Sequence, residues 1–133
     1  MPVQIGKTNR LKVLRKVSVG VYLDGDTIGD VLLPNRYVPQ NISEGDEIDV
    51  FIYLDSEDRL IATTEVPYAQ VGECAFLKVV SVSNVGAFMD WGLMKDLFVP
   101  FREQAVRMEK DRSYVVHVYF DHDTGRIAAS SKF

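Results

Sequence analysis

The chain has 133 residues, 47% of them hydrophobic and 26% charged, and its formal net charge at pH 7 is −4. This composition is typical of globular proteins and excludes disordered and collagen-like chains. The apolar runs are too short to cross a membrane and the N-terminus lacks the plan of a signal peptide, so we expect a cytoplasmic protein. Cys74 is the single cysteine of the sequence, which excludes an internal disulfide.

Period-two alternation of apolar and polar residues runs through the first half of the chain. Val19, Val21 and Leu23 alternate with other side chains over residues 19–24, and residues 48–54 follow the same pattern. Turn-forming residues separate these stretches at positions 24–26, 44–46 and 55–59. Five short strands are therefore predicted in this half.

The second half repeats the first, because residues 4–65 moved by 66 places align with residues 70–131 without a gap. Residues 85–90 and 114–120 alternate as their counterparts do, whereas Glu103 to Lys110 lacks alternation and predicts one or two helical turns. About 60 residues can just enclose a core, unlike the shorter repeats of solenoids. We therefore predict two tandem domains, residues 1–66 and 67–133, with a short linker near residues 66–70.

The predicted fold class is all-β, with two tandem five-stranded barrels of the OB-fold type. Five short antiparallel strands in about 65 residues, with one longer connection between the third and the fourth, are typical of that fold. A five-stranded open sheet and an SH3-like barrel also fit the pattern.

The second half resembles the RNA-binding repeat of ribosomal protein S1 over residues 70–132. The resemblance is carried by Val71-Gly72, Leu77-Lys78-Val79, Val85-Gly86-Ala87-Phe88-Met89-Asp90, Asp96-Leu97-Phe98-Val99-Pro100 and Gly125-Arg126-Ile127-Ala128-Ala129-Ser130. Through the repeat, residues 5–65 look like a more diverged copy. The pair is similar to the N-terminal part of the conserved virulence factor B family of bacterial RNA-binding proteins, which implies further domains downstream and a chain cut at a domain boundary.

The resemblance implies that single-stranded RNA lies on the barrel face, held by aromatic stacking and basic contacts. Phe88 occupies the place of the family's stacking phenylalanine, and Tyr22 is its counterpart in the first half. Arg126 matches the arginine that opens the last strand, and Asp121 lies near the paired acidic position. Lys78, Arg102 and Lys132 are expected to assist.

Three positions depart from the family pattern. Val85 replaces a second aromatic residue, Pro100 replaces a frequent histidine, and Leu60 stands where Arg126 stands in the other half, with Arg59 beside it as a substitute. These differences predict that the second half supplies most of the RNA contact and that the more acidic first half is a spacer or orienting module.

The sequence gives little support for a metal site or a catalytic site. Phe98, Phe101 and Phe120 are expected to fill the core or the domain junction, and Trp91 either covers a barrel end or stacks on a base. His117 and His122 lack partners at zinc-ligand spacing, and the segment starting at residue 121 lacks the closing glutamate of a calcium loop. We expect no metal, no cofactor and no catalytic activity.

The leading hypothesis is a non-catalytic protein that binds single-stranded RNA in bacterial post-transcriptional regulation, including that of virulence factors. The alternative is a protein-interaction adaptor that uses the same barrel faces without RNA contact, which the acidic balance favours. Oligosaccharide binding has only fold analogy behind it. RNA sequence preference, oligomeric state and the orientation of the two barrels are left open.

Overall fold

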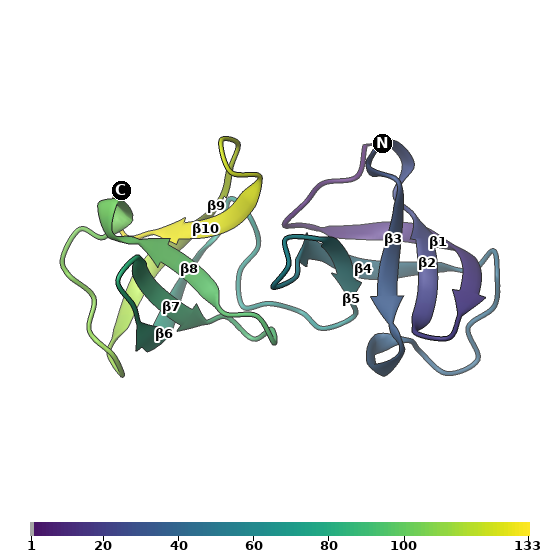
Figure 1. Cartoon of the computed structure of the whole chain (residues 1–133), viewed down its shortest axis with the longest axis horizontal. Coiled ribbons are helices and arrows are strands. Elements are labelled where there is room, and N and C mark those ends of the chain that lie inside the picture. Colours follow the sequence, from purple (N-terminus) through teal and green to yellow (C-terminus); the bar gives the residue numbers. More distant parts are fainter. Residues whose placement is uncertain (1) are drawn as a thin grey trace. The chain divides into compact units, whose positions relative to one another are not determined.

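The chain divides into two compact units, Met1–Val66 and Pro67–Phe133, in a computed structural model that describes residues 2–133 (Figure 1). The first unit contains β1 (Thr8–Val17), β2 (Gly20–Asp24), β3 (Asp30–Pro34), β4 (Glu47–Leu54) and β5 (Leu60–Thr63), with 3-10 turns at Asp26–Ile28 and Asn35–Tyr37. Its strands form a closed barrel in the order β1-β2-β3-β5-β4, in which β4 pairs back onto β1. The β3–β5 pairing, at Leu32 and Ile61, is parallel.

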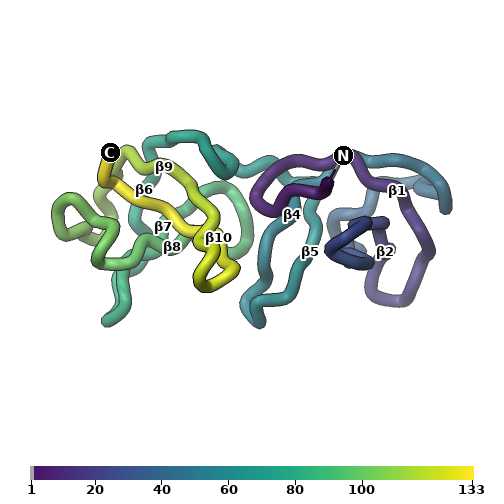
Figure 2. Tube along the Cα trace, turned by 90° about the horizontal axis from the view of Figure 1, so that it is seen from above, coloured from purple at the N-terminus to yellow at the C-terminus, as the bar shows by residue number. Residues whose placement is uncertain are grey.

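The second unit is a curled five-stranded half-barrel. It contains β6 (Cys74–Val82), β7 (Gly86–Asp90), β8 (Leu97–Pro100), a 3-10 turn at Phe101–Glu103, β9 (Ser113–Asp121) and β10 (Arg126–Ser130). The strand order is β10-β9-β6-β7-β8, and the end strands β8 and β10 are in contact. Figure 2 shows β9 and β10 as a yellow-green hairpin. Both units are OB-like, which confirms the all-β prediction.

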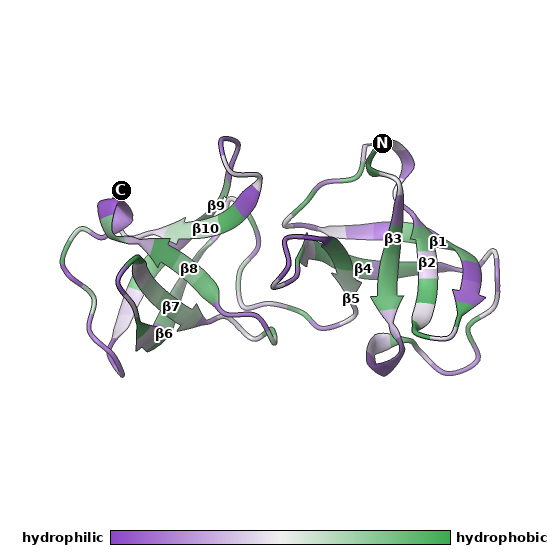
Figure 3. Cartoon of the chain, in the orientation of Figure 1, coloured by the Kyte–Doolittle hydropathy of each residue, from purple (hydrophilic) through white to green (hydrophobic). Residues whose placement is uncertain are grey.

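The two cores use corresponding positions. The barrel of the first unit encloses nine buried residues, Leu11, Val13, Val21, Leu23, Val31, Leu33, Val50, Ile52 and Ala62. The residues 66 places later are buried as well, and Figure 3 shows these strands as largely hydrophobic and the hairpin tips as hydrophilic. The alternation in the sequence therefore identifies the core face of almost every strand.

Two residues of the predicted core alternation lie outside it. Val19 and Val85 are 57% and 55% exposed, because β2 and β7 begin one residue later, at Gly20 and Gly86. The backbone of the next strand passes so close to these glycines that a side chain would overlap a carbonyl oxygen. The hairpin turn therefore ends at the glycine, and the preceding valine stays in the turn.

The helix predicted between Glu103 and Lys110 does not form. A single 3-10 turn ends at Glu103, and the following segment is irregular. The buried side chain of Gln104 donates a hydrogen bond to the Val99 carbonyl at 3.0 Å and accepts one from the Met108 amide at 2.9 Å. A side-chain amide thus bridges the loop and holds Met108 in the interior, where helical hydrogen bonds were expected.

Replacing Gln104 with alanine is expected to lower the free energy of unfolding by about 1–3 kcal/mol, because the buried Met108 amide loses its acceptor. Urea unfolding followed by the fluorescence of Trp91, the single tryptophan of the sequence, would measure this loss. Asn84→Ala, in an exposed turn of the same unit, is the control and should unfold like the parent. Equal midpoints for both variants would show that the bridge is dispensable.

Candidate nucleic-acid interface

Phe88 points outward in the second unit because its neighbours Ala87 and Met89 point into the core, and a β-bulge in β6 places Ser81 opposite it. In the β6–β7 pair, Val79 faces Met89 in the core, the register then shifts, and Ser81 faces Phe88. A bulge inserts one residue into a strand and re-aims the side chains that follow. Ser81 and Phe88 therefore lie together on the outer face of the sheet.

Phe98 lies beside Phe88 on that face. The two residues are cross-strand partners in β7 and β8, and their ring centroids are 5.2 Å apart at an interplanar angle of 37°. Leu97 and Val99 point into the core on either side, which turns Phe98 outward. We call Phe88 and Phe98 the aromatic platform.

Phe98 is half-buried and points away from the core, so the expectation that it fills the core is wrong. The alternation of Leu97 and Val99 was the signal in the sequence that could have shown this. Phe101 and Phe120 are half-buried; the Arg107 guanidinium lies 4.3 Å from the ring centroid of Phe101, and Phe120 meets the ring of His122 edge-on. Trp91 is buried, and its indole N–H donates to the Lys95 carbonyl.

The first unit has the same bulge but a different outer face. Arg15 faces Tyr22 across β1 and β2, and Tyr22 faces Leu32 in β3. The Arg15 guanidinium lies 4.5 Å from the centroid of the Tyr22 ring and donates to a carboxylate oxygen of Asp30 at 2.9 Å. Here a single aromatic ring is already covered by a cation.

Lys78 lies on the same outer face as the aromatic platform. It is the partner of Asp90 in the β6–β7 pair, and Asp90 is two residues beyond Phe88 on β7. Its ammonium is 3.9 Å from a carboxylate oxygen of Asp111, and the Lys78 side chain is 58% exposed. Such a weak surface ion pair leaves the cation available to a phosphate.

Arg126 and Asp121 face each other across the β9–β10 hairpin. Arg102 approaches the same carboxylate, with Nη2 at 3.5 Å from Oδ2 of Asp121. The structure therefore brings three of the predicted residues together. Burial would raise the pKa of the Asp121 carboxyl, but hydrogen bonds from Asp123 and Thr124 and the charge of Arg102 lower the pKa overall. Asp121 is thus an ionised turn residue that holds the hairpin and positions Arg102.

Tyr119 lies beside this cluster, and sequence reasoning did not single it out. Its hydroxyl is buried and has no hydrogen-bond partner among residues 2–133. Burial raises the pKa of Tyr119, and the charge of Glu103 adds to the effect while that of Arg102 opposes it. The phenol is therefore neutral at physiological pH.

Lys132 is not part of this cluster. It follows the end of β10, whereas Arg126 begins that strand. The Lys132 carbonyl is 3.1 Å from Nε2 of His117 on the neighbouring strand β9, and its side chain is exposed. Lys132 is therefore separated from Arg126 by the length of β10.

The register of the last hairpin differs between the units. Ile52 faces Ala62 in the first unit, but Val118 faces Ala129, not Ala128, in the second. A slip of one residue exchanges the two faces of a strand. It places Arg126 opposite Asp121, and in the first unit the residue opposite Asp55 is Arg59.

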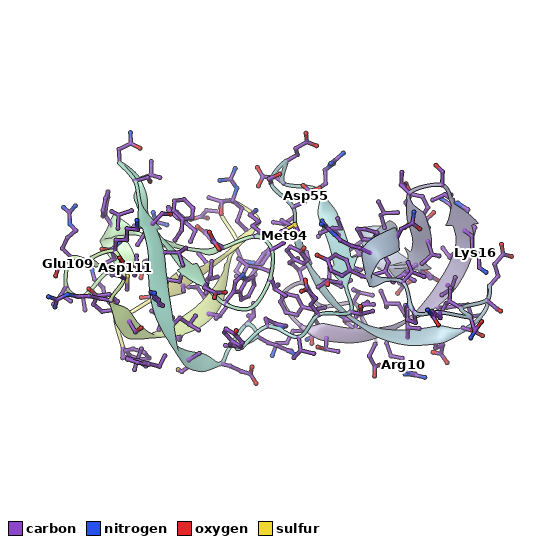
Figure 4. The ribbon with its side chains drawn as sticks, turned by 90° about the horizontal axis from the view of Figure 1, so that it is seen from below. Arg10, Lys16, Asp55, Met94, Glu109 and Asp111 are labelled. Carbon is purple, nitrogen blue, oxygen red and sulfur yellow. The ribbon has the colours of Figure 1, made fainter. Side chains whose placement is uncertain are left out.

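Arg59 therefore lies opposite Asp55 in the first unit as Arg126 lies opposite Asp121 in the second, the position expected of the substitute beside Leu60. Arg59 makes ion pairs with Asp55 at 3.1 Å and with Glu57 at 2.6 Å. Figure 4 labels Asp55 at the tip of the β4–β5 hairpin. Between equivalent paired residues the turn has five residues in the first unit, from Leu54 to Leu60, and six in the second, from Phe120 to Ile127. This difference in turn length was the signal that the gapless alignment obscured.

Comparison with known families gives a match to the S1 domain over residues 5–65. The matched residues form the first unit, whereas the residues that carried the resemblance in the sequence lie mainly in the second.

Two longer proteins are similar to this chain. The uncharacterized protein YitL of Bacillus subtilis (strain 168) is 35% identical over 96 residues, which cover 71% of this chain and 32% of that protein. A crystal structure from Streptococcus pneumoniae TIGR4, described as a multidomain protein with nucleic acid binding domains, matches with a TM-score of 0.79 and 18% identity. The match covers 97% of this chain and 46% of that one. The chain thus spans about a third of the curated relative and under half of the solved structure, whose similarity shows the fold.

The described residues 2–133 gather no group of three or more potential metal ligands. Within the same residues, none of the helical segments is long and apolar enough to span a membrane.

Proposed function

We propose that this chain binds single-stranded RNA on the outer strand faces of its two OB-like units, without catalysing a reaction. The observation that carries the proposal is the aromatic platform: two phenylalanine rings side by side on the outer face of β7 and β8, with Lys78 beside them. The S1 domain at residues 5–65 and the likeness to a protein with nucleic acid binding domains support it.

The platform suits an unpaired strand better than a duplex. Every base has a flat π-face, so stacking on an aromatic side chain contributes about 1–3 kcal/mol per base with little sequence preference. In a duplex the bases are stacked on one another and that face is inaccessible. Arg102 and Arg126, together at the β9–β10 hairpin, supply positive charge for the phosphates between stacked bases.

The net charge limits the role of electrostatics. Residues 1–66 carry 7 Lys or Arg against 11 Asp or Glu, and residues 67–133 carry 8 of each. Long-range attraction of a polyanion is therefore weak, and the affinity must come from short-range contacts. The second unit is the better candidate for these contacts, because its charge is balanced and it carries two adjacent aromatic rings on its outer face.

The proposal predicts a moderate salt dependence. If four cations neutralise phosphates, the slope of log K against log salt is about −2.8 for single strands, so affinity falls roughly 50-fold between 50 and 200 mM salt. Fluorescence anisotropy with a labelled oligouridine would measure the slope, and Lys78→Ala should make it less steep by about 0.7. An affinity that does not respond to salt, or no binding at 50 mM salt, would contradict the proposal.

One observation favours the adaptor alternative. Phe76 and Val115 are cross-strand partners on β6 and β9, and they are 70% and 52% exposed. An apolar pair of this kind is often a contact for another protein. An adaptor would show no RNA affinity in the experiment above.

The biological setting that we propose is post-transcriptional regulation in a bacterium, including that of virulence factors. Its support is the family resemblance, since the contacts in the structure concern binding alone. Crosslinking of the full-length protein to RNA in cells, followed by sequencing, tests this step. Recovery of no transcript above background would leave binding without a regulatory role.

A further inference from the structure

We propose that the residue after the bulge of the first strand in each unit decides whether the outer aromatic ring can stack on a base. The Arg15 guanidinium covers the Tyr22 ring in the first unit, whereas the short side chain of Ser81 faces Phe88 in the second. This inference rests on the proposed function and deepens it, because it assigns base stacking to the second unit and names the position that controls it.

The two positions are structurally equivalent. In the first unit the register shifts between Val13 and Arg15, and in the second it shifts between Val79 and Ser81. In both, the residue after the shift faces the outer ring of the neighbouring strand. The side chain at this position therefore lies next to the ring.

Arg15 is held over Tyr22 from two sides. Its guanidinium lies above the ring at 4.5 Å from the centroid and donates to Oδ2 of Asp30 at 2.9 Å. A flat guanidinium on an aromatic face occupies the position that a stacked base would take. A base can therefore stack on that face of Tyr22 only after Arg15 has lost both its cation–π contact with Tyr22 and its ion pair with Asp30.

The second unit has an aspartate equivalent to Asp30 but no arginine equivalent to Arg15. Asp96 stands 66 places after Asp30, immediately before β8, and the ion pairs among residues 2–133 do not include it. Burial raises the pKa of the Asp96 carboxyl, and the charge of Asp90 raises it further. An arginine at position 81 would find the ring of Phe88 and the carboxylate of Asp96 in the places that Tyr22 and Asp30 offer Arg15.

Adding a positive charge to an RNA-binding face normally strengthens binding. At position 81, however, the new cation should cover the Phe88 ring and weaken RNA binding. Removing the charge of Arg15 should, conversely, open a second stacking ring.

The test compares four variants of the full chain by fluorescence anisotropy with a labelled 15-nucleotide oligouridine at constant salt. Ser81→Arg is expected to weaken binding about tenfold. Asn84→Arg adds the same charge to an exposed turn of the same hairpin and should leave affinity equal or higher. Equal strengthening by both variants would overturn the proposal.

Arg10→Ser is the control for Arg15→Ser, because it also removes one positive charge from β1. Arg10 is labelled in Figure 4, pairs with Asp49 at 3.2 Å and is 60% exposed. Arg10→Ser should weaken binding about twofold through lost charge, whereas Arg15→Ser should bind at least as tightly as the parent. A larger loss with Arg15→Ser would show that Arg15 is itself an RNA contact and would overturn the proposal.

A measurement without RNA separates this inference from the proposed function. In NMR spectra of the parent, the ring current of Tyr22 should shift the side-chain protons of Arg15 upfield, and Tyr22→Leu should abolish the shift. Unshifted Arg15 protons in the parent would overturn the covering of Tyr22 whether or not RNA binds. Shifted protons together with no RNA affinity would overturn the proposed function and leave the covered ring established.

Discussion

Replacing Phe88 with alanine is expected to lower the affinity for single-stranded RNA by tenfold or more. One stacked base is worth about 1–3 kcal/mol, and each 1.4 kcal/mol corresponds to a factor of ten. Phe98 contacts the same ring at a centroid distance of 5.2 Å, so losing Phe88 also removes the lateral support of its neighbour. The effect should persist at high salt, because stacking, unlike phosphate contact, is not screened.

Two variants make this measurement specific. Phe88→Leu preserves apolar volume but lacks a flat π-face, so it should reproduce most of the loss while the unit stays folded. Phe76→Ala removes a phenylalanine that is 70% exposed on β6 and lies outside the platform, and it should bind RNA almost as the parent does. If Phe76→Ala and Phe88→Ala lose affinity equally, the RNA does not lie on the platform.

Replacing Gly86 with alanine should destabilise the second unit by about 1–3 kcal/mol, the usual range for forcing extra atoms into a packed structure. A Cβ at this position would overlap the carbonyl oxygen of Val99 and lie 3.0 Å from the Cα of Pro100, both backbone atoms that cannot rotate away. Gly86 begins β7, two residues before Phe88. The substitution should therefore disturb the β7–β8 pairing that places the two platform rings side by side.

Urea unfolding monitored by Trp91 would show this as a midpoint lower by about 1 M, for an m-value of roughly 1–2 kcal/mol per M. Gly125→Ala provides the comparison, because the added methyl group meets nothing within 4 Å there although φ is +73°. That variant carries backbone strain of about 1 kcal/mol without a collision. A midpoint for Gly86→Ala above that of Gly125→Ala would show that the two strands can separate to admit a side chain.

The sequence alone determined the core and the strands of this protein. Alternation placed Val21 and Leu23 inside with Tyr22 outside, and the repeat predicted the equivalent positions in the second unit, where Ala87 and Met89 are buried. Period-two burial is a local property of a strand, so the residues themselves carry it. Phe88 could be located on the outer face for the same reason.

Tertiary structure decided what surrounds each outward residue. A gapless repeat gave Leu60 the place of Arg126, yet the pairing of β4 with β5 puts Arg59 opposite Asp55, because the two hairpin turns differ by one residue. Strand pairing places the ring of Phe98 beside that of Phe88. Strand pairing and a bulge place the guanidinium of Arg15 over the ring of Tyr22. Register is set by turns and by partner strands, so no single stretch of sequence contains it.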